Sequence, residues 1–268
     1  MADKIALGRY YPGNSFLHRL DPRTKFLAVI FWMIVVLIPR AWQPITVLVA
    51  FSALLVLMTR VPLKEIYRTI KPIMFMILLA FVINLFASDG KVIWSWWKIS
   101  ITDKGLLNAF LMSIRLLILV LDTSLLLTLT TTPMQLADGL ESLLSPLKKV
   151  KFPVHEMAMI MSIALRFVPT LLEETDKIMK AQSSRGADYD TGGLIKKARG
   201  FVSILIPLFI GSFRRAEELA TAMEARCYHG GEGRTKLNEL HYTRLDIYFA
   251  VLIVSAGAAV LGLHYGLV

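Results

Sequence analysis

Long runs of apolar residues constrain the fold of this chain more than any other feature. Five such runs occur, each bounded by polar or charged residues: 26–38, 45–59, 73–87, 106–131 and 247–268. A helix that crosses the hydrocarbon core of a bilayer needs about 20 apolar residues, with a range of about 17–25. Some runs are shorter, so flanking residues must extend the helices or the local bilayer must be thin. The pattern predicts an all-α integral membrane protein with about five transmembrane helices.

The composition supports this class. Hydrophobic residues make up 55% of the 268 residues, and charged residues only 19%, compared with about 25% in a typical soluble domain. A net charge of +10 fits either a nucleic-acid-binding protein or a membrane surface. Because the basic residues cluster at the ends of the apolar runs, we assign the charge to membrane topology and expect no nucleic-acid partner. The only cysteine, Cys227, excludes an internal disulfide.

Basic residues in the connecting segments predict the orientation. The segment before the first run and the segment between the second and third runs are basic, whereas only Arg40 separates the first run from the second. The basic residues in question are Arg19, Arg23, Lys25, Arg60, Lys64, Arg68 and Lys71. The positive-inside rule then places the N-terminus in the cytoplasm and the C-terminus outside. Trp94, Trp96 and Trp97 fall in an outer loop and fit an interfacial aromatic belt.

This pattern predicts four regions. Residues 1–25 form a cytoplasmic N-terminal segment, and 26–131 form transmembrane helices 1–4. Residues 132–246 carry mixed charge and form a cytoplasmic region of long amphipathic helices. Residues 247–268 form a C-terminal transmembrane helix, in which the Gly262–Gly266 spacing favours close packing inside the bundle.

Residues 156–182 predict a long amphipathic helix. At 100° per residue its apolar side chains fall within one arc, and its charged side chains lie opposite. The apolar set is Met157, Met161, Ala164, Val168, Leu171, Leu172 and Met179. Pro169 should kink or bend this helix. The methionines indicate packing or, because methionine is adaptable, a surface that accepts several partners.

A second helix should follow, beginning in the uncharged stretch 200–213, which suits a buried or re-entrant segment, and ending near Arg226. The two helices end in similar phrases, Ser184-Arg185-Gly186 and Ala225-Arg226-Cys227. One interpretation is a cation at each helix C-terminus that offsets the dipole by about 0.3–1 kcal/mol, next to a left-handed cap. The other is docking, because a guanidinium offers a planar fork for a partner's carboxylate.

Two charged residues lie within the fourth apolar run. Arg115 and Asp122 are seven residues apart and so share a helix face. An intramembrane charge suggests an ion or proton pathway. The alternative is a buried polar patch with Thr123, Ser124 and Thr128 that holds helices together. We favour the patch, because a relay would need more than two groups.

Sequence signatures of catalysis are missing from this chain. It contains no phosphate-binding G-x-x-x-x-G-K-[ST] loop, no zinc-protease H-E-x-x-H, no G-x-S-x-G, and no cysteine and histidine cluster with metal-ligand spacing. We therefore expect no catalytic residue, no metal and no cofactor on this chain. If it serves an energy-driven process, the energy must come from a partner.

The sequence resembles a known family, the transmembrane T component of energy-coupling factor (ECF) transporters, over essentially its whole length. The opening residues 12–15 and 18–23 and the mid-helix residues 164–169 are similar to family motifs. The most specific match is the pair of Ala-Arg-Gly-like signatures, Ser184-Arg185-Gly186 and Ala225-Arg226-Cys227. Cys227 stands where the family usually has glycine or serine, and Ser184 where it usually has alanine.

The resemblance implies a complex with two ABC-type ATPases, which bind ATP, and a small membrane-embedded substrate-binding S component. Each signature arginine then enters a groove on one ATPase. The amphipathic helices move the S component, which releases a vitamin or a metal ion inside the cell. Met157, Met161, Leu165 and Val168 become candidate contacts for the S component.

Two alternatives remain open at this stage. A conventional ABC permease would bind substrate itself, in a polar cavity near Arg115 and Asp122. A membrane enzyme would need a catalytic constellation that the sequence lacks.

Overall fold

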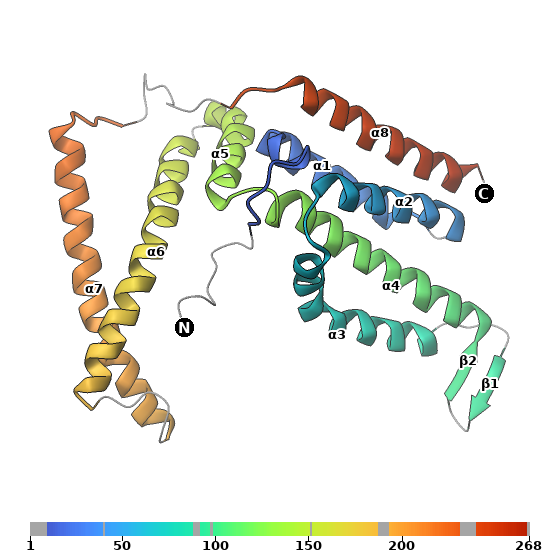
Figure 1. Cartoon of the computed structure of the whole chain (residues 1–268), viewed down its shortest axis with the longest axis horizontal. Helices are drawn as coiled ribbons and strands as arrows, with labels where there is room; N and C mark the ends of the chain where they lie inside the picture. The colour runs from blue at the N-terminus through green and yellow to red at the C-terminus, as the bar shows by residue number, and fades with distance from the viewer. Residues whose placement is uncertain are drawn as a thin grey trace. The chain divides into compact units, whose positions relative to one another are not determined.

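The computed structural model describes residues 10–39, 41–87, 92–96, 99–150, 152–186, 193–230 and 240–266, so Arg40 and Trp97 lie outside the described residues. Figure 1 gives the arrangement of the elements. In chain order they are η2 (Leu17–Arg19), α1 (Pro22–Leu37), α2 (Trp42–Thr59), α3 (Leu63–Ala87), β1 (Val92–Trp96), β2 (Ile99–Thr102), α4 (Asp103–Thr123), the π-helical η3 (Ser124–Thr128), α5 (Pro133–Leu144), η4 (Ser145–Val150), α6 (Val154–Ser184), α7 (Leu194–Ala225) and α8 (Arg244–Tyr265).

Two compact units divide the described chain. The first, which we call the bundle unit, contains the residues up to Leu140 and those from Leu240 onward. The second, which we call the arm unit, contains the residues from Glu141 to the end of the segment after α7. The predicted four-region division of the chain stays a prediction.

Five helices of the described chain are long and apolar enough to cross a membrane, which confirms the predicted class and the number of spans. They are α2, α3, α4 with η3, α6 and α8. Their membership differs from the predicted set, because α1 is absent and α6 is present. Helix α1 has 16 residues, or about 24 Å at 1.5 Å per residue, compared with about 30 Å of hydrocarbon. Pro39 follows its C-cap residue Ile38 and disfavours further helix.

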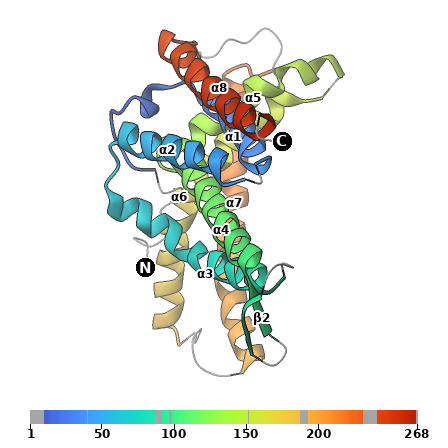
Figure 2. The same cartoon turned by 90° about the vertical axis from the view of Figure 1, so that its right-hand side faces the viewer.

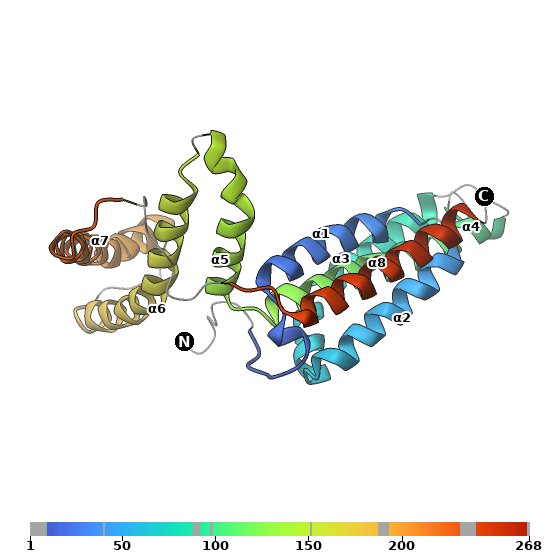
Figure 3. The same cartoon turned by 90° about the horizontal axis from the view of Figure 1, so that it is seen from above.

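The bundle unit is built around α4. Helix α4 contacts α1, α2 and α3, and α8 packs against α1 and α2. Figure 3 shows α1, α8 and α2 side by side. Large buried side chains from these helices form one core, including Trp32, Leu48, Leu55, Ile118 and Phe249. Helix α3 carries a proline, Pro72, inside its length, and its ribbon bends in Figure 1 as a proline in a helix predicts.

A buried carboxylate joins three helices of the bundle. Trp32 Nε1 on α1 and Ser52 Oγ on α2 each donate a hydrogen bond to Asp122 Oδ2 on α4, both at 2.7 Å. Asp122 is 1% exposed. Arg115 does not pair with it; its Nη2 donates to the carbonyl oxygen of Pro39. The arrangement supports the polar patch, although the partners come from other helices and not from the neighbouring Thr123 and Ser124.

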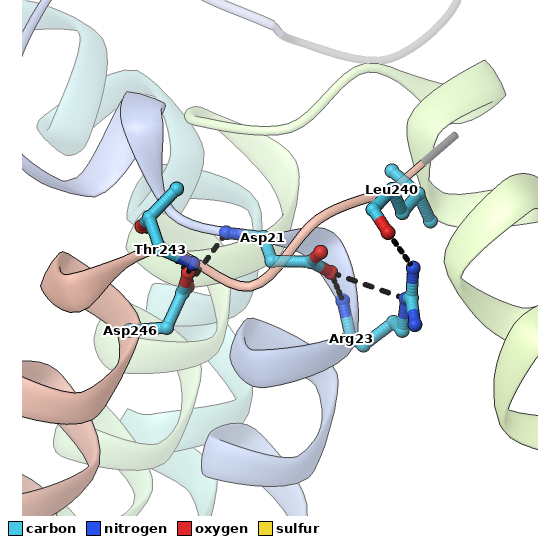
Figure 4. Close-up of polar contacts among 5 residues, drawn as sticks. All are labelled: Asp21, Arg23, Leu240, Thr243 and Asp246. Carbon is cyan, nitrogen blue, oxygen red and sulfur yellow. Dashed lines mark hydrogen bonds and ion pairs between the residues drawn. The ribbon is translucent and has the colours of Figure 1, made fainter. Parts of the chain in front are cut away.

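Two segments far apart in the sequence, 21–23 and 240–246, meet at the N-terminal end of α1 (Figure 4). Asp21 accepts a hydrogen bond from the Arg23 backbone N–H at 2.8 Å and is the N-cap of α1, whose first residue is Pro22. The Asp21 N–H donates to Asp246 Oδ1 at 2.8 Å. Arg23 Nη2 donates to the carbonyl oxygen of Leu240. The starts of α1 and α8 are thereby tied together.

Lys25 connects the N-terminal end of α1 to the residues that follow η3. Its Nζ donates to the Thr130 carbonyl oxygen at 2.9 Å and to Thr131 Oγ1 at 3.0 Å. Lys25 is 1% exposed, so this basic residue at the start of the first apolar run is buried. Lys25 lies just before the apolar run 26–38. Burial lowers its pKa to about 8, while the carboxylates of Asp246 and Asp21 act in the opposite direction.

Two details of the bundle unit depart from the sequence predictions. The described part of the connection between α3 and α4 contains a two-stranded antiparallel sheet, β1 with β2, so the predicted all-α fold carries one short hairpin. The close-packed glycine of α8 is Gly257, where an added Cβ would lie 2.8 Å from Phe31 Cζ on α1. A Cβ at Gly262 would have nothing within 4 Å, so the expected packing role of the Gly262–Gly266 spacing is wrong in the described chain.

The arm unit contains two long helices, α6 with 31 residues and α7 with 32. They run antiparallel and cross (Figures 1 and 2). An ion pair between Glu174 of α6 and Arg215 of α7 joins them. Gly211 allows this approach, because a Cβ there would lie 3.1 Å from Glu174 Oε1. Each helix contains the proline that the sequence places in it, Pro169 and Pro207.

Candidate functional site: two arginine-capped helix ends

The two signature arginines occupy the same position at the ends of α6 and α7. Arg185 is the C-cap of α6, with φ −87° and ψ 5°. Arg226 is the C-cap of α7, with φ −94° and ψ 16°. The next residue is left-handed in both cases, with φ +87° at Gly186 and φ 56° at Cys227. The repeated phrase in the sequence therefore corresponds to a repeated backbone geometry.

Backbone hydrogen bonds hold each end in this shape. At α7, the Cys227 N–H donates to the Glu224 carbonyl at 2.9 Å and the Tyr228 N–H donates to the Met223 carbonyl at 3.1 Å. These two bonds are the Schellman pattern that closes a helix after a left-handed residue. At α6, the Gly186 N–H donates to the Ser183 carbonyl at 3.0 Å. The carbonyls of Ser183, Met223 and Glu224 are thus satisfied by the backbone and do not need the arginine side chains.

Both arginine side chains are available to a partner. Ser184, Arg185, Gly186, Ala225, Arg226 and Cys227 are all exposed. Within the described segments, no hydrogen bond or ion pair holds either guanidinium. A guanidinium keeps its charge at any physiological pH and binds a carboxylate through two parallel N–H bonds. The geometry therefore suits recognition of an acidic site on another protein.

The two arginine ends are far apart. Helices α6 and α7 run antiparallel, so their C-termini point in opposite directions (Figures 1 and 2), and Glu174 pairs with Arg215 where the helices cross. Arg185 lies 11 residues beyond Glu174, and Arg226 lies 11 residues beyond Arg215, so each end is about 16 Å from the crossing at 1.5 Å per residue. One small ligand cannot contact both ends. The arrangement fits two separate partner sites.

The predicted contacts for a membrane partner lie on a face of α6 that α7 does not cover. An apolar groove of about 360 Å³ between the two helices is lined from α6 by Ile163, Phe167 and Leu171. Met157, Met161, Leu165 and Val168 do not line it. Met157 is 50% exposed and Met161 45% exposed, while Leu165 and Val168 are half-buried. Their role as a partner surface stays a prediction.

Sequence reasoning missed a second apolar surface, on the N-terminal half of α7. It consists of exposed large side chains from the stretch 200–213: Phe201, Val202, Leu205, Ile206, Phe209, Ile210 and Phe213. The uncharged stretch was interpreted as buried or re-entrant. Treating 194–225 as one unbroken helix, as α7 is, could have revealed this surface. Only one side of such a helix can face α6, so apolar side chains on its other sides are left uncovered.

The fold and the two helix ends define a polytopic helical membrane protein that presents two widely separated cationic ends on a helical hairpin. The comparisons with known proteins agree with this class. The sequence profile of the CbiQ family, described as a cobalt transport protein, matches residues 13–237.

Relatives along nearly the whole chain identify the family. A protein of Ruminiclostridium cellulolyticum is 52% identical over 247 residues, 92% of each chain. One of Acidaminococcus fermentans is 49% identical over 267 residues, 100% of this chain and 99% of the relative. One of Bacillus subtilis is 44% identical over 259 residues, 96% of this chain and 97% of the relative. All three are energy-coupling factor transporter transmembrane proteins, EcfT, and this chain belongs to that family. It is a transmembrane component of an ECF transporter.

Proposed function

We propose that this chain is the scaffold and energy-coupling subunit of an ECF-type importer. It transmits ATP-driven movements of two cytoplasmic ATPases to a substrate-binding S component, which takes up a vitamin or a metal ion. The chain itself is non-catalytic and binds neither substrate nor cofactor, and ATP belongs to the partner ATPases. The proposal assigns Arg185 and Arg226, with the small residues that flank them, to the two ATPases, one arginine each.

The observation that carries the proposal is the repeated geometry of the two exposed arginine ends. At both ends backbone hydrogen bonds close the helix, and the guanidinium is left exposed and without a partner in the described segments, as a docking group requires. The opposite directions of the two ends support two ATPases over one. The uncovered Met157 and Met161 face supports an apolar membrane partner, because methionine adapts to several packing arrangements.

The proposed orientation has support from the bundle unit. The N-terminal ends of α1 and α8 lie next to the residues that follow α4, through the bonds of Asp21 and Lys25. These are ends that the positive-inside rule assigns to the cytoplasm. In this orientation α1 crosses the bilayer despite its length, the arm unit lies in the cytoplasm of the prokaryotic cell, and the C-terminus lies outside.

Charge reversal at the two helix ends tests the proposal. The chain is co-expressed with its neighbouring transporter subunits, and the double variant Arg185→Glu, Arg226→Glu is compared with the wild type. We expect loss of ATPase co-purification, or retained ATP hydrolysis with uptake reduced at least about tenfold. Arg166→Glu and Arg214→Glu reverse one exposed charge on each helix away from the ends and serve as matched controls. Full uptake by the double variant would refute the docking role.

Cys227 provides an independent readout, because it is the only cysteine and is exposed beside Arg226. A maleimide should label Cys227 rapidly in the isolated chain and much more slowly in the complex with ATPases. Equal labelling rates would show that this helix end is not covered.

The conventional permease predicts instead that the purified chain binds substrate through a polar cavity near Arg115 and Asp122. Neither residue lines the α6–α7 groove, and both bond within the bundle. Substrate binding by the isolated chain would favour the permease and displace the proposal.

A further inference from the structure

A cavity of about 540 Å³ opens at the end of the bundle unit where α2 stops and α8 begins. Its volume lies in the range of about 300–1,000 Å³ that is typical of small-molecule sites. The lining residues are Asn14, Ser15, Phe16, Arg19, Leu57, Met58, Arg60 and Leu245. The cavity belongs to neither arginine-capped end, so it is independent of the proposed ATPase docking.

The lining combines two cations with an apolar wall and contains no acidic residue. Arg19 and Arg60 are exposed. In the part of the chain that the structure describes, neither guanidinium takes part in a hydrogen bond or ion pair. Ser15 Oγ is already bonded to His18 Nδ1 at 2.6 Å. The described residues therefore do not neutralise the positive charge of the cavity.

Arg60 holds a backbone conformation that its residue type disfavours. It is the C-cap of α2, with φ 52° and ψ 23°, a left-handed conformation in which glycine and asparagine are common and other residues are not. A glycine would end the helix here without strain. The residue at this position is instead an arginine, which contributes a second cation to the cavity.

The position of the cavity along the helices indicates its occupant. Leu57 and Met58 belong to the last turn of α2, a candidate span, and Leu245 to the first turn of α8, another candidate span. The cavity thus lies at the level where apolar helix gives way to polar chain, which is the headgroup level of a bilayer. Basic pockets between transmembrane helices are suited to anionic lipid headgroups.

We propose that this cavity binds the headgroup of an anionic phospholipid. Arg19 and Arg60 contact the phosphate, Asn14 contacts the glycerol or headgroup oxygens, and the acyl chains lie along Phe16, Leu57 and Leu245. A soluble anion would gain nothing from the apolar wall, and an apolar ligand would leave both guanidiniums without a partner. The amphipathic lining suits a lipid on both counts.

Lipid retention by the purified full-length chain tests this site. The protein is equilibrated with equal amounts of phosphatidylglycerol and phosphatidylcholine, washed, and its bound lipids are quantified by mass spectrometry. We expect phosphatidylglycerol to be enriched in the wild type, and the enrichment to fall about tenfold or more in Arg19→Gln, Arg60→Gln. Lys64→Gln, Lys71→Gln removes two exposed charges of α3 outside the cavity and should keep the enrichment.

A third variant separates lipid binding from folding. Arg60→Gly relieves the left-handed strain, so its Tm should equal or exceed that of the wild type while phosphatidylglycerol enrichment falls. Lack of enrichment in the wild type, or an equal loss in the Lys64 and Lys71 control, would overturn the proposal. Displacement of the bound lipid by inorganic phosphate alone would assign the cavity to a soluble anion and would also overturn it.

Discussion

Cys227 is a residue held in a conformation that its side chain does not favour. A residue with a Cβ in the left-handed region costs roughly 1–2 kcal/mol relative to its right-handed form. Because Cys227 has φ 56° and Gly186 has φ +87°, Cys227→Gly should stabilise the end of α7 by about 1 kcal/mol, and Gly186→Ala should destabilise the end of α6 by a similar amount. Amide hydrogen exchange of the two helix ends measures both changes. Changes of the same sign at both ends would contradict the shared cap geometry.

Substitutions of Asp122 test whether this intramembrane charge has a structural role. Replacement by leucine leaves the Trp32 Nε1–H and the Ser52 hydroxyl without their acceptor, at about 1–3 kcal/mol for each buried donor. Asp122→Asn keeps an oxygen that both donors can use, so it should cost much less. Thermal unfolding in detergent compares the two variants. An Asp122→Asn protein that keeps its Tm but loses uptake would restore the ion or proton pathway.

Residue chemistry was predictable from the sequence where it is local. Neighbouring residues in the chain are enough to predict three features: the N-cap Asp21, the prolines inside α6 and α7, and the small residue after each signature arginine. Lys25 could not be interpreted this way, because its oxygen acceptors lie 105 and 106 residues away, at Thr130 and Thr131. A single sequence does not distinguish a buried lysine from a lysine in a loop.

Among the elements, the α6–α7 pair depends on one ion pair at its crossing. Glu174 and Arg215 are partly buried, with side chains 25% and 31% exposed. Glu174→Arg or Arg215→Glu alone places like charges opposite each other and should weaken the pair by about 1 kcal/mol, whereas the double exchange should recover most of the loss. A double-mutant cycle on the unfolding free energy gives the coupling. Additive effects of the two exchanges would show that the pair contributes nothing to the crossing.

The elements that the sequence did not predict have physical reasons. The β1–β2 hairpin lies in a loop whose strands of five and four residues are too short for a clear alternating pattern. The π-helical η3 inside the run 106–131 depends on backbone bonding, such as the Leu129 N–H to the Ser124 carbonyl at 2.8 Å, and apolar composition carries no sign of it. Helix lengths and apolar faces, which are periodic, were predictable.

At the scale of the whole molecule, the chain leaves and re-enters the bundle unit at the N-terminal end of α1. The chain passes to the arm unit after Leu140 and returns at Leu240. A Cβ at Gly139 would lie 3.0 Å from Pro22 Cβ, so α5 starts its exit in close contact with α1. The return is fixed by Arg23, through the Leu240 carbonyl and by lying 5.0 Å from the Tyr242 ring centroid. Both connections are therefore held by residues 22 and 23.

Lys25 should make the unfolding free energy depend on pH through its contacts at the N-terminal end of α1. Its pKa is about 8 in the folded protein and 10.5 without burial, so between these values the unfolded chain binds more protons than the folded one. The unfolding free energy should therefore rise with pH from about 8 to 10.5, as the cost of burying the ammonium disappears. Lys25→Met removes the titrating group, so it should lack this gain, while groups common to both proteins contribute equally. The Tm of both proteins is measured in detergent at about pH 7.5 and at about pH 9.5. A lysine whose pKa is lowered by burial titrates within this range. Parallel pH profiles would mean that Lys25 is paired or hydrated well enough to keep its ordinary pKa, and that the contacts among α1, α4 and α8 do not depend on its protonation.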